Sequence, residues 1–159
     1  MSKKTIEKLL NKAYFYLYLR QRSEKEMYEY LKKKVKTYHA TEEDVEEVMK
    51  KLRLQKYLND DAFVDSYVRH QTAIKPKGEY ALRLELLKKG ISETKINSYF
   101  EQTDLDEKAL AKEALAKVWS RYKNLDFIKR KKRGIDFLSR RGFSFDTAKQ
   151  AMEYMEKNT

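Results

Sequence analysis

Five consecutive basic residues near the C-terminal end of the sequence are its strongest candidate for binding chemistry: Lys129, Arg130, Lys131, Lys132 and Arg133. Lysine and arginine neutralise phosphate groups and release their counterions, so such a run fits contact with nucleic acid or with acidic protein loops. Five consecutive helical residues make more than one turn, so they cannot all lie on one face of the helix. The aliphatic parts of some of these side chains must therefore lie along the core side. A solubilising surface is the alternative, but the basic character of this end of the chain favours contact.

Smaller groups of cations stand at predicted helix ends. Two pairs come directly before a glycine, and three lysines occupy a similar place earlier in the chain. Cations in the last turn of a helix offset its dipole, so a structural role and a ligand-binding role are both open for them. We take them as further candidates for binding: Lys88, Lys89, Arg140, Arg141, Lys32, Lys33 and Lys34.

Catalytic chemistry finds little support in the sequence. There is no cysteine, which excludes disulfides, thiolate metal sites and cysteine nucleophiles. His39 and His70 lack the spacing of metal ligands, and Asp60, Asp61 and Asp65 fit the first turn of a helix, where the dipole favours acidic residues. No phosphate-cradling glycine loop, nucleophile elbow or zinc-binding helix is present. We expect no catalytic residue, no metal and no cofactor.

The charge of this 159-residue chain indicates a polyanionic partner. The net charge is +11, and it is uneven: residues 1–59 hold 15 Lys and Arg against 9 Asp and Glu, residues 60–105 hold 7 against 8, and residues 106–159 hold 14 against 8. A ligand touched at both ends fits this pattern. The sign alone does not separate nucleic acid from an acidic protein or membrane surface. No apolar run reaches the length of a membrane span, and the first residues lack the apolar core of a signal peptide, so we expect a cytoplasmic protein without membrane contact.

A motif of alanine, an aromatic residue and arginine recurs three times and predicts a helical repeat. The arginine follows the alanine by seven residues, which is two helical turns, and in the second and third copies a glycine follows 21 residues after the arginine. Because the arginines occupy equivalent positions, a structural role between helices is favoured over a repeated ligand contact. The three copies are Ala13, Tyr18, Arg20; Ala62, Tyr67, Arg69; and Ala114, Trp119, Arg121.

A hinge between helices also recurs, at Gly90–Phe100 and Gly142–Met152. The glycine can adopt the left-handed conformation that ends a helix. Ser92 is then a good N-cap, with Ile91 placed to pack on Ile96 as a hydrophobic staple. The first copy differs, because Lys34 replaces the glycine and about five extra residues lengthen the turn.

These patterns, with four glycines and one proline, predict an all-α protein of three tandem three-helix repeats at residues 1–58, 59–103 and 104–159. We expect the repeats to stack into an elongated, curved array, since one repeat cannot bury both its faces alone. The aromatic stretch Ala13–Leu19 has strand propensity, but its alignment with the other copies favours helix. The twelve tyrosines and Trp119 could stack on bases, but at helical spacing they are expected in the core. The predicted helices are Thr5–Gln21, Ser23–Lys34, Thr41–Leu54, Asp60–Gln71, Lys77–Lys89, Ser92–Gln102, Asp104–Tyr122, Asp126–Arg141 and Ser144–Asn158, with a capping box at Ser23 and Glu26.

Four ordered segments, found within residues 13–155, resemble the successive motifs of the RecX family, regulatory proteins of the RecA recombinase. They are LRQRSEKEMYEYL at 19–31, KYLNDDAFVDSYVRH at 56–70, ELLKKGI at 85–91 and FLSRRGFSFDTA at 137–148. The resemblance implies three tandem three-helix repeats that bind the RecA filament on DNA along its groove and restrain its assembly, ATP hydrolysis and strand exchange in repair and recombination. The chain departs from the family at Lys34 and at Lys77–Glu79, where many relatives follow the glycine with proline.

Two other hypotheses remain open. The chain could be a free-standing module that binds single- or double-stranded DNA directly, or a helical scaffold for an acidic protein. We expect a monomer. Neither the contacts with RecA nor those with DNA are carried by a short motif, so the twelve basic candidates above are assigned by charge and position alone.

Overall fold

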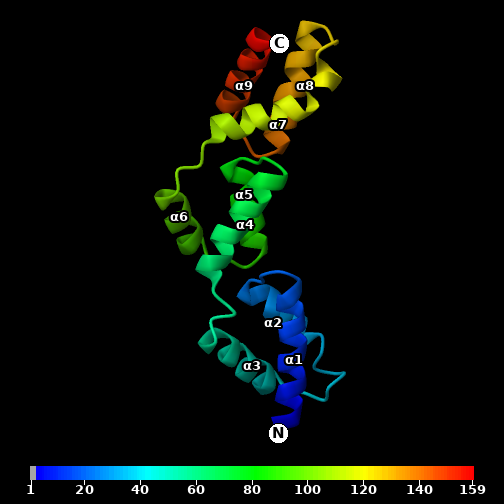
Figure 1. Cartoon of the computed structure of the whole chain (residues 1–159), viewed down its shortest axis with the longest axis vertical. Coiled ribbons are helices and arrows are strands. Elements are labelled where there is room, and N and C mark those ends of the chain that lie inside the picture. Colours follow the sequence, from blue (N-terminus) through cyan, green and yellow to red (C-terminus); the bar gives the residue numbers. More distant parts are fainter. Residues whose placement is uncertain (1–2) are drawn as a thin grey trace. The chain divides into compact units, whose positions relative to one another are not determined.

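A computed structural model describes residues 3–159, which contain nine α-helices and no strand (Figure 1). The all-α prediction is therefore confirmed, and each helix lies within a few residues of its predicted range. None of the helices in this part of the chain is both long and apolar enough to cross a lipid bilayer. The helices are α1 Lys3–Leu19, α2 Glu24–Lys32, α3 Glu42–Leu54, α4 Asp60–Ile74, α5 Glu79–Lys88, α6 Glu93–Gln102, α7 Glu107–Tyr122, α8 Phe127–Arg140 and α9 Phe145–Asn158.

The chain divides into two compact units. The first unit holds residues 1–65 and 87–95, and the second holds residues 66–86 and 96–159. The division passes through α4, α5 and α6, so the middle three helices contribute to both units. The repeat boundaries after residues 58 and 103 differ from this division and stay a prediction.

In the first unit, α1, α2 and α3 pack on one another around an aliphatic core. Each helix turns an apolar face inward, as the spacing of its apolar residues requires. The aromatic stretch Ala13–Leu19 is helical throughout, as its alignment predicted. The buried residues of this core are Leu9, Ala13, Met27, Leu31, Val45, Val48, Met49, Leu52 and Leu58.

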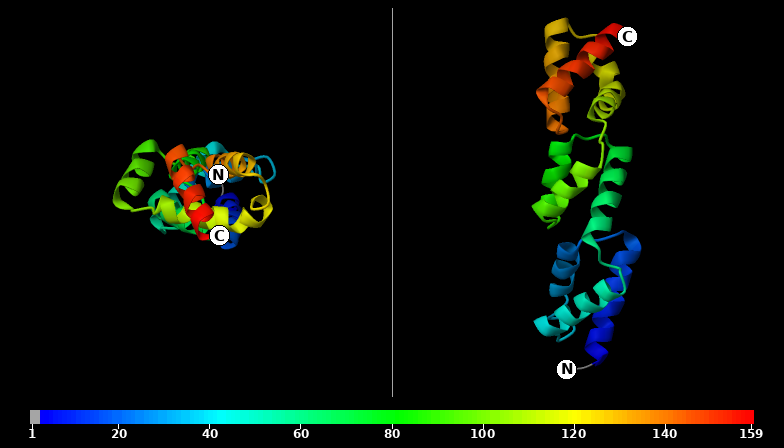
Figure 2. Two further views of the ribbon diagram at one scale, coloured as in Figure 1. Left: turned by 90° about the horizontal axis from the view of Figure 1, so that it is seen from above. Right: turned by 90° about the vertical axis from the view of Figure 1, so that its left-hand side faces the viewer.

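In the second unit, α7, α8 and α9 form the corresponding three-helix core. The views of Figure 2 show α8 and α9 side by side, and they are among the most closely packed pairs of the chain. Gly134 of α8 makes this approach close, because a Cβ there would lie 2.1 Å from the Met152 sulfur. The buried residues are Ala111, Ala114, Leu115, Val118, Trp119, Leu138, Phe143, Ala148, Ala151, Met152 and Met155.

The local signals for helix ends are confirmed. Ser23 and Glu26 form the predicted capping box at α2, and Ser92 Oγ accepts a hydrogen bond from the Lys95 N–H at 3.3 Å. Gly90 and Gly142 have φ of 82° and 86°, the left-handed values expected at the hinges. In the variant first copy the turn ends instead at His39, whose φ is 52°.

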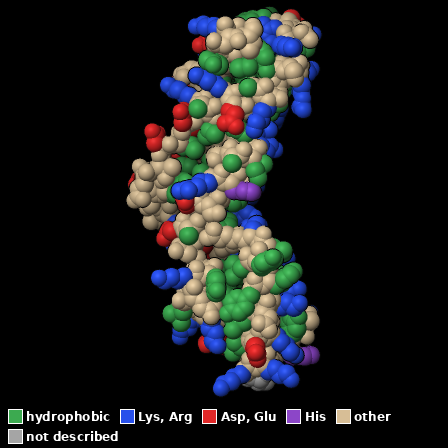
Figure 3. Space-filling view, viewed as in Figure 1, with side chains coloured by type: hydrophobic (Ala, Val, Ile, Leu, Met, Phe, Trp, Pro, Cys, Tyr) green, Lys and Arg blue, Asp and Glu red, His purple; other side chains and the backbone are tan. Residues whose placement is uncertain are grey.

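The expectation that the tyrosines lie in the core is met only in part: none of the twelve is fully buried, but five are partly buried and pack against the two cores, namely Tyr16, Tyr28, Tyr30, Tyr38 and Tyr122. A tyrosine ring can cover apolar surface while its hydroxyl group meets a polar partner. Tyr14, for example, donates to Gln55 Oε1 at 3.0 Å, and Tyr18 on the same helix is 86% exposed. Figure 3 shows hydrophobic side chains gathered on the surface of the unit that contains the N-terminus. Trp119, in contrast, is buried as expected.

Candidate nucleic-acid interface

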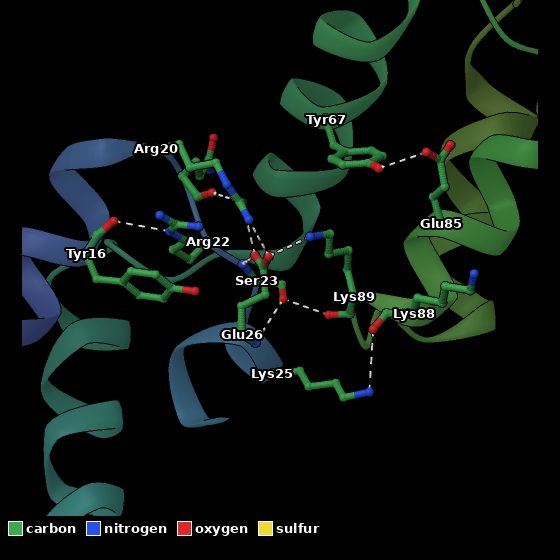
Figure 4. Close-up of polar contacts among 11 residues, drawn as sticks. Tyr16, Arg20, Arg22, Ser23, Lys25, Glu26, Tyr67, Glu85, Lys88 and Lys89 are labelled. Atoms are coloured by element: carbon green, nitrogen blue, oxygen red, sulfur yellow. Dashed lines mark hydrogen bonds and ion pairs between the residues drawn. The ribbon is translucent and has the colours of Figure 1, made fainter. Parts of the chain in front are cut away.

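Two sets of hydrogen bonds tie the second helix of one repeat to the next repeat, and we call them the first and second joints. In the first joint, Ser23 Oγ donates to the Lys89 carbonyl at 2.7 Å (Figure 4). The Glu24 N–H donates to Asp60 Oδ1 at 3.0 Å. Ser23 caps α2, Lys89 follows α5, and Asp60 begins α4. The joint therefore satisfies free polar groups at three helix ends.

The second joint repeats this arrangement with different side chains. The Gly78 N–H donates to the Arg141 carbonyl at 2.8 Å, and the Glu79 N–H donates to Glu107 Oε1 at 2.5 Å. Gly78 precedes α5 as Ser23 precedes α2, and Glu107 begins α7 as Asp60 begins α4. Acidic residues at the start of α4 and α7 thus bind the preceding repeat, a role beyond the dipole effect that the sequence suggested.

Glycine is required at both joints for space as well as for conformation. A Cβ on Gly142 would lie 2.4 Å from Ala81 Cβ and 2.5 Å from the Ala81 nitrogen. A Cβ on Gly90 would lie 2.5 Å from Lys25 Cβ. The positive φ would strain any other residue at either position. These glycines therefore allow the hinge backbone to contact the first turn of the preceding repeat's second helix.

The cations of the first joint are neutralised by Glu26. Its carboxylate pairs with Arg20 at 2.6 Å and with Lys89 at 2.8 Å, and its side chain is only 12% exposed. Burial alone would raise the pKa of Glu26, but hydrogen bonds from Arg20, Lys89 and the Ser23 N–H outweigh it and lower the pKa to about 2. Arg20, the first of the three repeated arginines, thus has a structural role (Figure 4).

In the second joint Ala81 stands at the position of Glu26, three residues after the residue that precedes the helix. No carboxylate is therefore offered to Arg141 from this position. Arg141 donates to the Pro76 carbonyl at 3.3 Å and lies 4.8 Å from the Phe137 ring centre, and burial lowers the pKa of its guanidinium. The guanidinium of Arg141 is thus contacted by two neutral groups, which do not neutralise its charge.

A cleft of about 480 Å³ opens beside the second joint. Phe137 and Ala81 contribute its apolar lining. Lys77 pairs with Glu85 at 2.5 Å and with Gln71 at 2.8 Å, so the charge of Lys77 is matched. Lys75 and Arg140 are exposed and have no side-chain partner among residues 3–159. The charged residues that line the cleft are Lys75, Lys77, Glu85, Arg140 and Arg141.

The basic run on α8 separates into residues with different roles. Arg130 is 15% exposed, and it binds Glu156 of α9 at 2.5 and 3.0 Å and the Leu125 carbonyl at 2.6 Å. Hydrogen bonding to Glu156 raises the pKa of Arg130. Arg130 therefore fastens α8 to α9, whereas Lys132 and Arg133 are exposed and Lys131 is half-buried. Lys129 is exposed and lies 3.9 Å from Asp126.

Three exposed cations of α8 share one helix face. Lys129, Arg133 and Arg140 are separated by four and seven residues, which are about one and two helical turns. Asp136 lies on the same face, between Arg133 and Arg140. The row leads from the basic run to the cleft, so the structure brings part of the run and Arg140 onto a single surface.

The remaining predicted cations are not part of this surface in the second unit. Lys32 pairs with Glu42 at 3.3 Å, Lys34 lies 5.1 Å from the Tyr30 ring centre, and Lys33 is exposed. Lys88 is exposed at the first joint, where its carbonyl accepts a hydrogen bond from Lys25 Nζ at 3.5 Å. These residues belong to the first unit.

Comparisons with known proteins place this architecture in a family. The models of the second and third three-helix domains of RecX match residues 59–98 and 106–152. A crystal structure titled as regulatory protein RecX is 30% identical to the chain with a TM-score of 0.75, and the match covers 94% of the chain and 72% of that protein. The chain belongs to the RecX family. Its all-α fold of repeated three-helix domains is thereby confirmed.

Other RecX proteins show how far the likeness extends. A crystal structure of RecX from Lactobacillus salivarius, 24% identical, shares the fold with a TM-score of 0.78 over 98% of the chain and 99% of that protein. The regulatory protein RecX of Bacillus cytotoxicus is 30% identical over 156 residues, which are 96% of the chain and 55% of that relative. That of a Geobacillus species is 38% identical over 102 residues, 64% of the chain and 36% of the relative. The chain spans about half, or less, of the length of the Bacillus cytotoxicus and Geobacillus relatives.

Lys75 and Lys77 were missed by sequence reasoning. Each is an isolated lysine on either side of Pro76, so no run of charge marks them. The only available signal is the equivalence of the repeats: Gly78 corresponds to Ser23, and Arg141 corresponds to Lys89. Once the contact between Ser23 and Lys89 is known, this equivalence places residues 75–78 near the basic residues that precede Gly142. Without the geometry of the joint, that equivalence did not indicate a cleft.

Proposed function

We propose that this chain is a non-catalytic modulator, mainly an inhibitor, of the RecA recombinase. It binds the RecA–DNA filament along its groove and restrains filament assembly, ATP hydrolysis and strand exchange. The observation that carries the proposal is membership of the RecX family, whose relatives bear the name of regulatory proteins. The protein acts in the cytoplasm as a monomer, with repeats at residues 1–58, 59–103 and 104–159.

The distribution of charge supports a binding role over a catalytic one. Lys132, Arg133 and Arg140 of α8, and Lys75 beside the second joint, are exposed and have no acidic partner in the described part of the chain, whereas Lys129 pairs with Asp126. A filament of recombinase and DNA is a long polyanion, and it offers phosphates and acidic side chains to such cations. The mechanism is occupancy: the repeats bridge sites on the filament and block the movement or addition of RecA protomers.

The test is the ATP hydrolysis and strand exchange of RecA on single-stranded DNA at increasing concentrations of this protein. Both activities fall as the protein approaches micromolar excess. Unchanged activities at that excess would refute the proposal. A variant with Lys131→Glu, Lys132→Glu and Arg133→Glu keeps the Arg130–Glu156 bond, so it retains its helical content and inhibits more weakly. Undiminished inhibition by that variant would show that the basic run is only a solvated surface.

Direct binding to DNA is a second candidate function, and the cleft beside the second joint favours it. This candidate requires an affinity for bare DNA that equals or exceeds the affinity for the filament. The two functions are therefore separated by comparing the same protein on bare DNA and on RecA-coated DNA.

A further inference from the structure

The two joints place cations in the same way but neutralise them differently. At the first joint, Glu26 accepts both Arg20 and Lys89. At the second joint, alanine replaces this glutamate, and the cations that precede Gly142 meet no acidic residue from that position. Both joints connect corresponding helix ends, although the donor to the carbonyl is the Ser23 hydroxyl at the first joint and the Gly78 N–H at the second. The loss of the carboxylate is therefore a difference in charge at an equivalent position.

We propose that the cleft beside the second joint is a phosphate-binding site for the backbone of single-stranded nucleic acid. Lys75, Arg140 and Arg141 supply its positive charge. The proposal deepens the proposed function, on which it rests for its biological setting, by assigning a place where the DNA of the filament is held.

The cleft holds three more positive than negative side chains, and Glu85 is already occupied. Glu85 Oε1 accepts from Lys77 at 2.5 Å and from Tyr67 at 3.3 Å. The Lys77–Glu85 pair is thus internal to the cleft wall and leaves the other three cations unmatched. Concave surfaces that carry one sign of charge focus the electric field and raise the local concentration of counterions.

The positions of the cations fit a polymer better than a single carboxylate. Lys75 lies at the end of α4, whereas Arg140 and Arg141 lie at the end of α8. A single carboxylate such as that of Glu26 gathers cations at one point, whereas successive phosphates of a nucleic-acid strand can reach cations on separate segments in turn. Arg133, which is exposed on the same face of α8 as Arg140, extends the cationic surface beyond the cleft.

Arg141 is prepared for this role by its surroundings. Its contacts with the Pro76 carbonyl and the Phe137 ring orient the guanidinium without neutralising it. Burial lowers the pKa of this guanidinium, and an anionic ligand would offset that cost of desolvation. Arg140, which is exposed, retains its donors for the same ligand.

The test uses the whole chain and a short fluorescent single-stranded oligonucleotide, with affinity measured by anisotropy over a series of salt concentrations. The variant Lys75→Gln/Arg140→Gln removes two exposed cations without touching a core residue. Its affinity is expected to fall about tenfold, and the slope of log K against log salt should become shallower by roughly 1.4, or about 0.7 for each lost phosphate contact. The matched control is Lys108→Gln/Lys123→Gln, which removes two exposed lysines of the same unit.

Two further variants probe the cleft from its walls. Ala81→Glu restores the acidic residue of the first joint and should lower the affinity for the oligonucleotide about tenfold. Glu85→Gln keeps the size and hydrogen-bonding capacity of the side chain but removes the negative charge, so it should raise the affinity about threefold. Circular dichroism verifies that all variants keep the helical content of the parent chain.

Three outcomes would overturn the assignment. Equal losses in the cleft variant and the control would show that only net charge matters. An unchanged affinity and slope in the cleft variant would show that the cleft does not contact phosphate. Weaker binding to the RecA filament with unchanged binding to bare DNA would assign the cleft to an acidic side chain of the recombinase. The proposed function is tested separately, since it fails only when the parent chain leaves RecA unaffected.

Discussion

The two joints of this chain connect corresponding helix ends but use different side chains, and Ala81 at the second joint replaces the carboxylate of Glu26. In both, the end of one helix binds the start of an earlier helix, and the first residue of another helix supplies a carboxylate. At the first joint, Glu26 forms ion pairs with Arg20 and Lys89, so these two cations have a structural role. At the second joint, Ala81 leaves them available. The comparison teaches that similar cations before a glycine are paired with a carboxylate or left without one, according to the third residue of the neighbouring helix.

The largest effect should come from the glycines, and it should differ between the joints. Gly142→Ala places a methyl group against the backbone of Ala81 and imposes a left-handed alanine, so we expect a loss of about 3 kcal/mol in the free energy of unfolding. Gly90→Ala meets the Lys25 side chain, which can shift in part, and should cost about 2 kcal/mol. Urea denaturation measures both values. Losses below about 0.5 kcal/mol at either glycine would contradict the close approach.

Removal of the charge at Glu26 should destabilise the first joint. Glu26→Gln loses both ion pairs of a side chain that is largely buried, and we expect a loss of about 2 kcal/mol at neutral pH, after allowance for screening by solvent. Glu29→Gln, on an exposed position of the same helix, is the matched control and should change the stability by less than about 0.5 kcal/mol. Similar values for the two variants would show that the first joint depends on shape alone.

The same residue predicts the pH dependence of stability. Because the pKa of Glu26 is lowered from 4.5 to about 2 by its hydrogen bonds, its contribution is fully present above pH 4.5 and is lost as the pH falls toward 2. The stability difference between the parent chain and Glu26→Gln should therefore shrink through this interval. Denaturant unfolding at a series of pH values measures the difference. A constant difference between pH 5 and pH 2 would mean that the carboxylate titrates normally.

The local signals in the sequence were sufficient for the helices and hinges. Serine followed by glutamate, and glycine before serine, mark helix ends through bonds between neighbouring residues, so Ser23, Ser92, Gly90 and Gly142 could be assigned in advance. The joints could not, because Ser23 meets Lys89 and Gly78 meets Arg141 across more than 60 residues. No local pattern encodes such contacts.

The candidate site was predicted only in part, for a related reason. Charge alone identified Arg140, Arg141 and the run on α8, but it did not distinguish Arg130, which binds Glu156, from Arg133, which is exposed. That distinction depends on the rotation of α8 against α9. The exposed tyrosines were misassigned because the amphipathic character of tyrosine allows surface positions at the same helical spacing as core positions.

The smallest change in stability should come from introducing the carboxylate of the first joint at the equivalent position of the second. Ala81→Glu adds a carboxylate near partly exposed cations, so we expect a gain of about 0.5 kcal/mol in stability that disappears at high salt. Thermal unfolding at low and high salt measures the gain. A loss of stability that persists at high salt would mean that the second joint has no room for the longer side chain.

The central claim is that this chain recognises a recombinase filament on DNA. The most direct test is the affinity of the labelled chain for the RecA filament, for bare single-stranded DNA and for free RecA, measured over one series of salt concentrations. The account predicts that the filament binds most tightly and that its binding weakens as salt increases. Equal or tighter binding to bare DNA, or no binding to the filament even at low salt, would contradict it.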